Sequence, residues 1–304
     1  MDQKIIESGT DGGAVLMPHP DVPSSSGGVA AGVVMCLLSM SCIQFGSALS
    51  SSAIATYGPT GATWLRLAFA AVALAVIVRP KVTRYSREQW VGALALGSMT
   101  AMMTISFFSA IERIPLGLAV AIDFLGPLAV ATLGFGLSRQ LLWPLAAGIG
   151  VLLLAYDGQE WVGNLPGVLF AFGAAAGWAC YILLTKKVGS AFKGFEGLSM
   201  SLIIAAIVAT PFGFASAVPH LTGHGLLEMA GLALLVPLLP YALEMVALRR
   251  MPTSSFGILM SLEPAIGAFA GFVILTQPLT PSQMFGTGLV VAASIGATVF
   301  AAKS

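Results

Sequence analysis

Charged side chains are scarce in this sequence. Only 9% of its 304 residues are Asp, Glu, Lys or Arg, while 57% are hydrophobic and the mean hydropathy is +0.91. About a quarter of the residues in a typical soluble domain are charged, and so few ionic groups cannot coat a water-soluble globule of this length. The scarcity excludes an ordinary soluble protein. It predicts an integral membrane protein whose main partner is the lipid bilayer.

A concentrated basic surface is also missing. The formal net charge is +1 and no cluster of Lys and Arg forms a phosphate-binding patch, which argues against a nucleic-acid partner. The three cysteines, Cys36, Cys42 and Cys180, stand in apolar runs without a CxxC spacing, so we expect packing residues rather than a redox or metal site. The three histidines lie in the N-terminal segment and in a predicted loop. Neither a metal nor a cofactor is therefore expected.

Motifs of catalysis are absent as well. The chain has no nucleophile elbow, no HExxH and no P-loop, and the segment GPTGATW at 58–64 lacks the Lys of a phosphate-binding loop. We therefore expect no enzymatic activity and no ATP hydrolysis at a Walker-type site. Any transport would draw on an ion gradient or on the gradient of the substrate itself.

Long apolar runs are what the sequence has in abundance. Each can cross a hydrocarbon core of about 30 Å as a helix. Because backbone polar groups must be satisfied inside lipid, and the runs lack the alternation of a β-barrel, we expect an all-α fold. Ten transmembrane helices are predicted, at 29–49, 60–79, 90–110, 116–136, 140–156, 165–186, 196–215, 226–247, 253–275 and 281–301. Residues 1–28, rich in Gly, Pro, Ser and acids, are predicted to be a disordered cytoplasmic tail.

The basic residues predict how these helices are oriented. With the N-terminus in the cytoplasm, twelve of the 14 Lys and Arg residues fall on the cytoplasmic side, Arg113 alone falls outside, and Arg66 lies within a span. The reverse orientation would invert this asymmetry. Both termini are therefore expected in the cytoplasm.

Two segments of the chain look alike. The stretch AIERIPLGLAVAIDFLGPLA at 110–129 aligns without a gap on ALRRMPTSSFGILMSLEPAI at 247–266, a shift of 137 residues. The matched residues include Arg113 with Arg250, Pro115 with Pro252, Leu125 with Leu262 and Pro127 with Pro264. Apolar sequence of low complexity can match by chance, but two prolines and an arginine favour a duplication. The predicted repeats are 29–158 and 159–304.

The two predicted repeats would run in opposite directions. The first motif enters the fourth helix from outside, and the second enters the ninth from inside. Inverted five-helix repeats, related by a pseudo-two-fold axis in the membrane plane, are typical of secondary transporters with a site near the midplane. The pattern predicts transport by alternating access.

Ionisable residues inside the predicted spans indicate a functional site. A charged side chain at the centre of a membrane helix costs about 2.5–3.5 kcal/mol, so each needs a compensating role. Those within spans include Arg66, Asp123, Glu244 and Glu263. Asp123 and Glu263 lie in the middle third of the bilayer and shortly before Pro127 and Pro264. These prolines should kink both helices and free a backbone carbonyl, and we predict the binding site there.

Structural alternatives stay open for the same residues. Asp123 or Glu263 can form a buried ion pair with Arg66, and Glu244 can pair with the arginines that follow it. Glu228 and Glu112 are expected at helix ends in water.

Weaker candidates lie in the first and sixth spans. Gln44, Trp178 and Tyr181 are polar or amphipathic, and Trp178 and Tyr181 share a helix face because they are three residues apart. They can line a cavity, or they can serve as packing residues whose polar groups are satisfied. Two pairs of small residues suit close helix packing inside the bundle or in a homodimer. These pairs are Gly173/Gly177 and Gly267/Gly271.

Five stretches carry a resemblance to a known family. They are TWLRLAFA at 63–70, IPLGLAVAIDFLGPLAVA at 114–131, GWACYIL at 177–183, LPYALEMVALRRMPTSSFG at 239–257 and LMSLEPA at 259–265. The chain resembles EamA-type members of the drug/metabolite transporter (DMT) superfamily, and among them the threonine and homoserine exporters of bacterial inner membranes. The resemblance covers residues 36–300, and its most specific part runs from Leu239 to Pro264.

The resemblance implies a ten-helix carrier with two inverted EamA repeats that exports small neutral amino acids by proton exchange. The positions that match the subgroup are Arg66, Pro127, Trp178, Tyr241, Glu244, Glu263 and Pro264. The subgroup more often has Glu where this chain has Asp123, and Gly where it has Phe45. The first departure keeps the charge and alters its reach, while the second alters the cavity shape.

The leading hypothesis is export of a zwitterionic amino acid. Its ammonium would lie against Asp123 or Glu263, and its carboxylate against Arg66 or against amides freed at a helix break. Because low-dielectric surroundings favour the neutral form of a carboxyl group, a proton can displace the ammonium and couple proton influx to export. The alternatives are export of another polar metabolite or of an amphipathic cation and, from a different class, a non-transporting receptor or scaffold.

Overall fold

A computed structural model describes residues 26–133, 142–156, 162, 164–192, 194–248, 250 and 253–301. Regular secondary structure in these residues is helical, as the composition predicts. Helix α1 begins at Ser26. Residues 26–28 of the predicted tail are therefore helical, which corrects its predicted boundary, and the rest of the tail lies outside the described residues. Arg249 and Pro252 of the second repeat motif lie outside them as well.

Thirteen α-helices make up the described part of the chain. They are α1 (Ser26–Leu49), α2 (Ser51–Val78), α3 (Arg87–Ile111), α4 (Leu116–Asp123), α5 (Leu125–Leu133), α6 (Leu142–Leu154), α7 (Leu165–Ala191), α8 (Glu196–Ala217), α9 (Gly223–Ala233), α10 (Leu239–Leu248), α11 (Thr253–Met260), α12 (Glu263–Leu275) and α13 (Pro281–Ala301). Short 3-10 turns occupy Val82–Arg84 and Val218–His220, and a π-helical segment, η3, spans Leu234–Leu238.

The helices are long and apolar enough for a multi-pass membrane protein. Eight candidate spans are found among the described residues, with two shorter apolar helical stretches at Leu116–Val130 and Leu142–Leu154. These are compatible with the ten predicted crossings. The outer surface of the bundle is apolar, with Val76 65% and Phe285 68% exposed, which is the opposite of a soluble helix bundle and suits contact with lipid.

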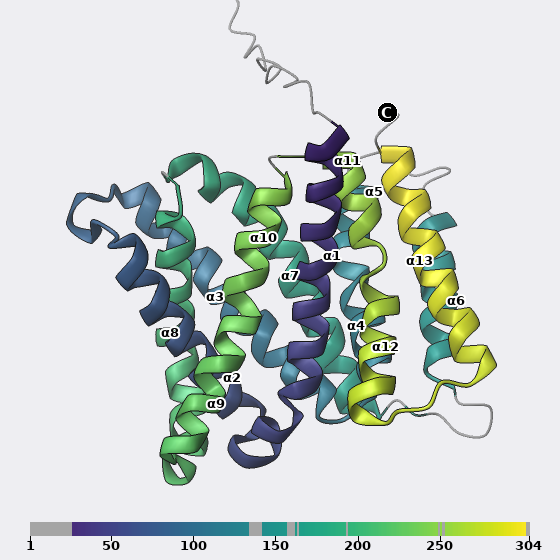
Figure 1. Cartoon of the computed structure of the whole chain (residues 1–304), viewed down its shortest axis with the longest axis horizontal. Coiled ribbons are helices and arrows are strands. Elements are labelled where there is room, and N and C mark those ends of the chain that lie inside the picture. The colour runs from purple at the N-terminus through teal and green to yellow at the C-terminus, as the bar shows by residue number, and fades with distance from the viewer. Residues whose placement is uncertain are drawn as a thin grey trace, which may run out of the picture.

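The bundle brings the two halves of the chain together. Helix α1 begins, and α13 ends, at the same end of the bundle (Figure 1). Helix α2 packs on α8, α6 packs on α13, and α4 packs on α12, so three spans of the first half each contact their counterpart in the second. Helix α3 packs on α7, and α1 packs on α10. These two contacts are equivalent, because α3 corresponds to α10 and α7 corresponds to α1 in the two halves. This pairing is compatible with two related repeats.

Small residues permit close helix contacts inside this chain. A Cβ atom on Gly177 would lie 3.0 Å from the Cβ of Met103 in α3, and one on Gly267 would lie 2.9 Å from Cγ2 of Val120 in α4. Both glycines thus belong to contacts within the bundle. Of the cysteines expected to pack inside it, Cys36 is buried, whereas Cys180 is exposed on the outside.

The fourth and ninth predicted spans are each divided into two helices rather than kinked. Helix α4 ends at Asp123 and α5 begins at Leu125, while α11 ends at Met260 and α12 begins at Glu263. Pro127 and Pro264 fall in the first turn of the second helix in each case. A missing N–H costs little there, because the first N–H groups of a helix have no partner within it. The break therefore precedes each proline.

The span predicted over 226–247 is present as a candidate span over Gly223–Glu244, but it contains an interruption that the sequence analysis did not predict. Helices α9 and α10 are separated by η3, in which Val236 has an extended backbone with φ −149° and ψ 116°. The physical reason lies in two prolines. Pro237 and Pro240 have no N–H to donate to the carbonyls four residues earlier, so the helical ladder fails here and leaves the Val236 carbonyl free. This third break has no counterpart in α3, which runs continuously.

Candidate functional site

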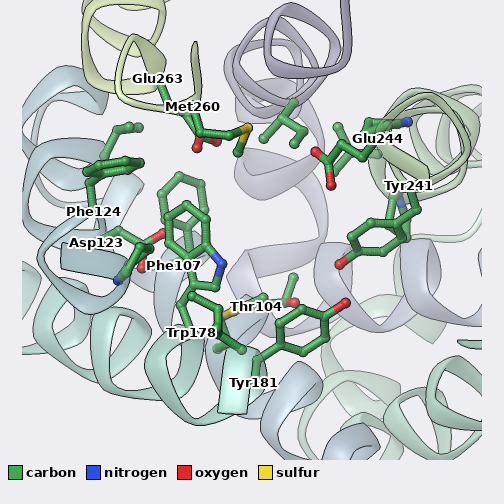
Figure 2. A pocket seen from close by; sticks show the side chains of 18 of the residues that line it. Thr104, Phe107, Asp123, Phe124, Trp178, Tyr181, Tyr241, Glu244, Met260 and Glu263 are labelled. Atoms are coloured by element: carbon green, nitrogen blue, oxygen red, sulfur yellow. The ribbon is translucent and has the colours of Figure 1, made fainter. Parts of the chain in front are cut away.

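A cavity of about 760 Å³ lies between the helices (Figure 2). It is lined by all eight residues predicted to bind substrate, which come from six different helices. These residues are Gln44, Arg66, Asp123, Trp178, Tyr181, Tyr241, Glu244 and Glu263. Pro127 also lines the cavity, whereas Pro264 is buried beside it. The structure thus brings the predicted site residues together around one space.

Glu263 begins α12 and is only 3% exposed. The Nε2 group of Gln44 donates a hydrogen bond to its Oε1 atom at 3.0 Å. The other carboxyl oxygen, Oε2, and the Gln44 Oε1 atom have no hydrogen-bond partner among the described residues. Buried acceptors without partners are costly, so this pair of side chains is suited to a ligand that carries several N–H or O–H donors.

Asp123 ends α4 on another part of the cavity wall. Its Oδ1 atom is buried and has no hydrogen-bond partner in the described structure. The ring of Phe124, the next residue, packs edge-on against Trp178 with centroids 5.8 Å apart. Asp123, Glu244 and Glu263 all line the cavity. Three carboxyl groups therefore face one space from different helices.

Arg66 is buried but is not paired with an acid, contrary to the alternative in which it forms an ion pair with Asp123 or Glu263. Its Nε and Nη2 atoms donate to the Val236 carbonyl at 3.4 and 3.2 Å, and Nη1 donates to Ser50 Oγ at 3.4 Å. Its guanidinium carbon lies 4.3 Å from the centroid of the Phe108 ring. The cation thus binds the carbonyl that the α9–α10 break leaves free, where a helix end carries partial negative charge. Among the described residues the one ion pair joins neighbouring Glu112 and Arg113 at the surface.

Glu244 and Tyr241 lie on the wall opposite Asp123 and Phe124 (Figure 2). Ser39 Oγ donates to Glu244 Oε1 at 2.8 Å. Of the two arginines considered as partners of Glu244, Arg250 is exposed and forms no ion pair with it, and Arg249 lies outside the described residues. The hydroxyl groups of Tyr241 and Tyr181 face each other across the cavity edge (Figure 2).

Apolar and aromatic side chains form most of the remaining lining. Phe107, Phe108, Phe124 and Phe256 contribute rings, together with several aliphatic residues and methionines. A mostly apolar cavity with a few convergent polar groups is typical of small-molecule sites, and its volume falls within their usual range of about 300–1,000 Å³.

The cavity extends towards the end of the bundle where α1 begins and α13 ends. Arg66 and Phe108 line it, as do Phe256 in the first turn of α11 and Thr298 in the last turn of α13. These two helix ends lie on the side where α1 begins (Figure 1). Towards the opposite end α4 and α12 approach closely, since a Cβ atom on Gly117 would lie 3.1 Å from the Cβ of Ala268.

Other predictions concern groups outside the cavity. Glu112 directly follows α3 and is exposed, as expected for a helix end. Glu228 is exposed as well and accepts a hydrogen bond from Ser52, but it lies in the middle of α9 rather than at a helix end. In the part of the chain that the structure describes, no three His, Cys, Asp or Glu side chains lie close enough to hold a metal ion.

Several polar residues of the site were not singled out from the sequence. Ser39 positions Glu244, and Ser294 lines the cavity beside the α11–α12 break. No sequence signal marks these serines among many in apolar helices. The η3 break did have a signal, the VPLLP segment at 236–240, whose two prolines indicate an interruption.

Comparison with known proteins identifies relatives over nearly the whole chain. The family model described as "EamA-like transporter family" matches residues 165–299. The threonine/homoserine exporter RhtA of Escherichia coli (strain K12) is 37% identical over 273 residues, which are 89% of this chain and 92% of that protein. The threonine/homoserine exporter RhtA of Salmonella typhimurium (strain LT2) is 37% identical over 269 residues, 88% and 91% of the two chains.

More distant relatives agree on the class of protein. The uncharacterized transporter YvbV of Bacillus subtilis (strain 168) is 24% identical over 258 residues, 80% of this chain and 83% of that protein. A crystal structure of a protein 17% identical in sequence superposes with a TM-score of 0.58, covering 92% of this chain and 99% of that chain. Similarity at this level shows the fold alone. The relatives named here are transporters, not enzymes.

Proposed function

Because this chain belongs to the EamA-like transporter family, we propose that it is a secondary active transporter that exports threonine, homoserine or similarly small neutral amino acids across a bacterial inner membrane. The observation that carries the proposal is the buried Glu263–Gln44 pair, which presents two unpartnered acceptor oxygens to a cavity in the bundle. The sequence identity to two threonine/homoserine exporters supports the substrate class.

The polar groups of the cavity suit a zwitterion. Acceptors gather at Glu263, Gln44 and Asp123, and each has an oxygen without a partner among the described residues. An α-ammonium group supplies three donors to such a set. On the side of the cavity away from Asp123 lie the hydroxyls of Tyr181 and Tyr241, which can donate to the α-carboxylate (Figure 2). The ammonium therefore binds at the two helix breaks and the carboxylate at α7 and α10.

The number of acids in the cavity supports the proposal of proton antiport. Three carboxylates cannot all stay ionised in a low-dielectric cavity whose single arginine is engaged elsewhere. Glu263, Asp123 and Glu244 therefore need a neutralising proton or an ammonium group. Since the two compete for the same oxygens, proton binding expels the substrate, and substrate binding expels the proton.

Alternating access is proposed from the two-fold pattern of helix contacts and the matched breaks. The α2–α3 connection lies at the end of the bundle where α1 begins and α13 ends (Figure 1). Its basic residues are all exposed: Arg79, Lys81, Arg84 and Arg87. Basic loops favour the cytoplasm, which places both termini there. The cavity then extends towards the cytoplasm, as an exporter requires when it loads substrate. The two inverted repeats would exchange their packing to open the opposite side.

A second candidate is export of an amphipathic cation or another polar metabolite. The volume of about 760 Å³ exceeds what one small amino acid fills, and much of the lining is aromatic. Aromatic rings and acids together attract organic cations. A receptor or scaffold without transport activity is the alternative from another class.

Counterflow in proteoliposomes tests the proposal. Vesicles loaded with unlabelled threonine and containing the purified protein should accumulate labelled threonine, while empty liposomes should not. Inhibition by a panel of neutral amino acids, nucleosides and cationic dyes then distinguishes the two transport functions. Inhibition by dyes alone would favour the cation exporter, and no flux of any compound would favour the receptor or scaffold.

A further inference from the structure

The serine hydroxyls beside the α11–α12 break form a chain of hydrogen bonds. Ser294, on α13, is 3% exposed and lines the cavity. Its Oγ atom donates to Ser261 Oγ at 2.7 Å, and Ser261 Oγ donates in turn to the Gly257 carbonyl at 3.1 Å. Ser261 is fully buried and stands two residues before Glu263. The chain therefore links α13 to the break that positions the acid.

The direction of these hydrogen bonds determines what Ser294 can offer a ligand. A serine hydroxyl has one proton and two acceptor lone pairs. The hydroxyl protons of Ser261 and Ser294 are both donated in these hydrogen bonds, so the Ser294 oxygen presents a hydrogen-bond acceptor to the cavity. The lining hydroxyls of Thr100, Thr104 and Thr298 instead donate to carbonyls of their own helices. Among these hydroxyls Ser294 is the one whose orientation is set by the broken helix.

We propose that Ser294, oriented by Ser261, accepts a hydrogen bond from the side-chain hydroxyl of the substrate and so determines specificity for hydroxylated amino acids. The inference rests on the proposed function, because it takes the substrate ammonium to lie on Glu263 and Gln44. With the ammonium at the break, the adjacent Ser294 meets the substrate side chain rather than its carboxylate, for which the donors are on α7 and α10.

The physical basis of this selection is the loss of one hydrogen bond. Valine has the shape of threonine with a methyl group in place of the hydroxyl, and norvaline has the corresponding relation to homoserine. A methyl group against Ser294 Oγ would leave that acceptor buried without a ligand donor. A neutral hydrogen bond of this kind changes affinity by about tenfold, so the unmodified carrier should prefer each hydroxylated member by about that factor.

The experiment measures competition against labelled threonine in proteoliposomes containing the full chain. Threonine and valine are compared as competitors, and so are homoserine and norvaline. In Ser294→Ala the preference for the hydroxylated member should fall from about tenfold to about onefold, through weaker binding of threonine and homoserine rather than through tighter binding of valine and norvaline. Thr287→Val is the matched control, because Thr287 is a buried hydroxyl on the same helix that donates to its own backbone and does not line the cavity. It should keep the full preference.

The outcomes separate this inference from the proposed function. Transport of threonine and valine with equal affinity by the unmodified protein overturns the role of Ser294 while leaving amino-acid export intact, and it needs no variant. An unchanged preference in folded Ser294→Ala overturns it as well. If no amino acid competes and none is transported, the proposed function itself fails.

Discussion

The break between α4 and α5 and the break between α11 and α12 occur at aligned sites of the two repeats. They differ in the position of the acidic residue. In the alignment that shifts the chain by 137 residues, Asp123 corresponds to Met260 and Gly126 corresponds to Glu263. The first helix ends at the same aligned position in both repeats, and the second helix begins one aligned position later in the second repeat, in each case just before the aligned proline. In the α4–α5 break the acid ends the first helix, whereas in the α11–α12 break it begins the second.

Packing explains why the acids are not interchangeable. A Cβ atom on Gly126 would lie 2.2 Å from the Ala175 carbonyl oxygen, so α5 has no room for a side chain at the position that Glu263 occupies in α12. At the other aligned position, Met260 lines the cavity with an apolar group. A duplicated break has thus acquired two different acids, of which only Glu263 is held by a neighbouring amide. We expect the two breaks to respond unequally to substitution.

The largest effect is expected at the acid of the second break. Glu263→Gln removes the charge that binds the substrate ammonium, and a hydrogen bond to a charged group contributes about 1.5–3 kcal/mol. Threonine counterflow should therefore fall by about a hundredfold at a given substrate concentration. Counterflow in reconstituted vesicles with matched protein amounts measures this. Activity within twofold of the unmodified carrier would exclude Glu263 from substrate binding.

The second-largest effect is expected for Gly126, the residue of the first break that aligns with Glu263. It should appear as a loss of stability of the folded protein. In Gly126→Ala the new methyl group would overlap the Ala175 backbone, and overpacking of this kind costs about 1–3 kcal/mol. Thermal unfolding in detergent should show a lowered Tm. The matched control is Gly148→Ala, because a Cβ atom there meets nothing within 4 Å. Equal melting temperatures for the two variants would contradict the close contact between α5 and α7.

The acid of the first break should have a smaller role in transport. Asp123→Asn keeps the shape of the side chain and removes its charge, while Glu263 remains to bind the ammonium. Counterflow should fall by about tenfold, the equivalent of about 1.4 kcal/mol. A loss larger than that of Glu263→Gln would reverse the order and make Asp123 the main ammonium site.

The residue aligned with Asp123 should matter least. Met260→Leu conserves volume and polarity, and such exchanges usually cost less than about 1.5 kcal/mol. We expect threonine affinity to change by less than about threefold, as measured by competition against the labelled substrate. A large loss would indicate that the thioether contacts the substrate directly.

The sequence predicts the helices and the location of the site well, because lipid imposes strong constraints. Backbone groups inside the bilayer require helices, and ionisable residues there require partners or a function. Hence the predicted substrate residues, from Gln44 to Glu263, do line one cavity. The prolines also indicate where two helices are interrupted, although the interruptions precede Pro127 and Pro264 rather than coincide with them.

Side-chain partners could not be predicted in the same way. Arg66 binds the Val236 carbonyl instead of an acid because a third break, caused by Pro237 and Pro240, lies beside it. That contact joins residues 170 positions apart, and its geometry depends on how α2 packs against η3. The Ser294–Ser261 chain likewise arises from the contact of α13 with the α11–α12 break.

The central claim is that protons and substrate compete for the Glu263–Gln44 pair. The most direct measurement is the efflux of labelled threonine from proteoliposomes under an imposed inward proton gradient, compared between the unmodified protein and Glu263→Gln. The account predicts that the gradient accelerates efflux by the unmodified carrier and has no effect on the residual efflux of the variant. Equal acceleration of efflux in both proteins would contradict it.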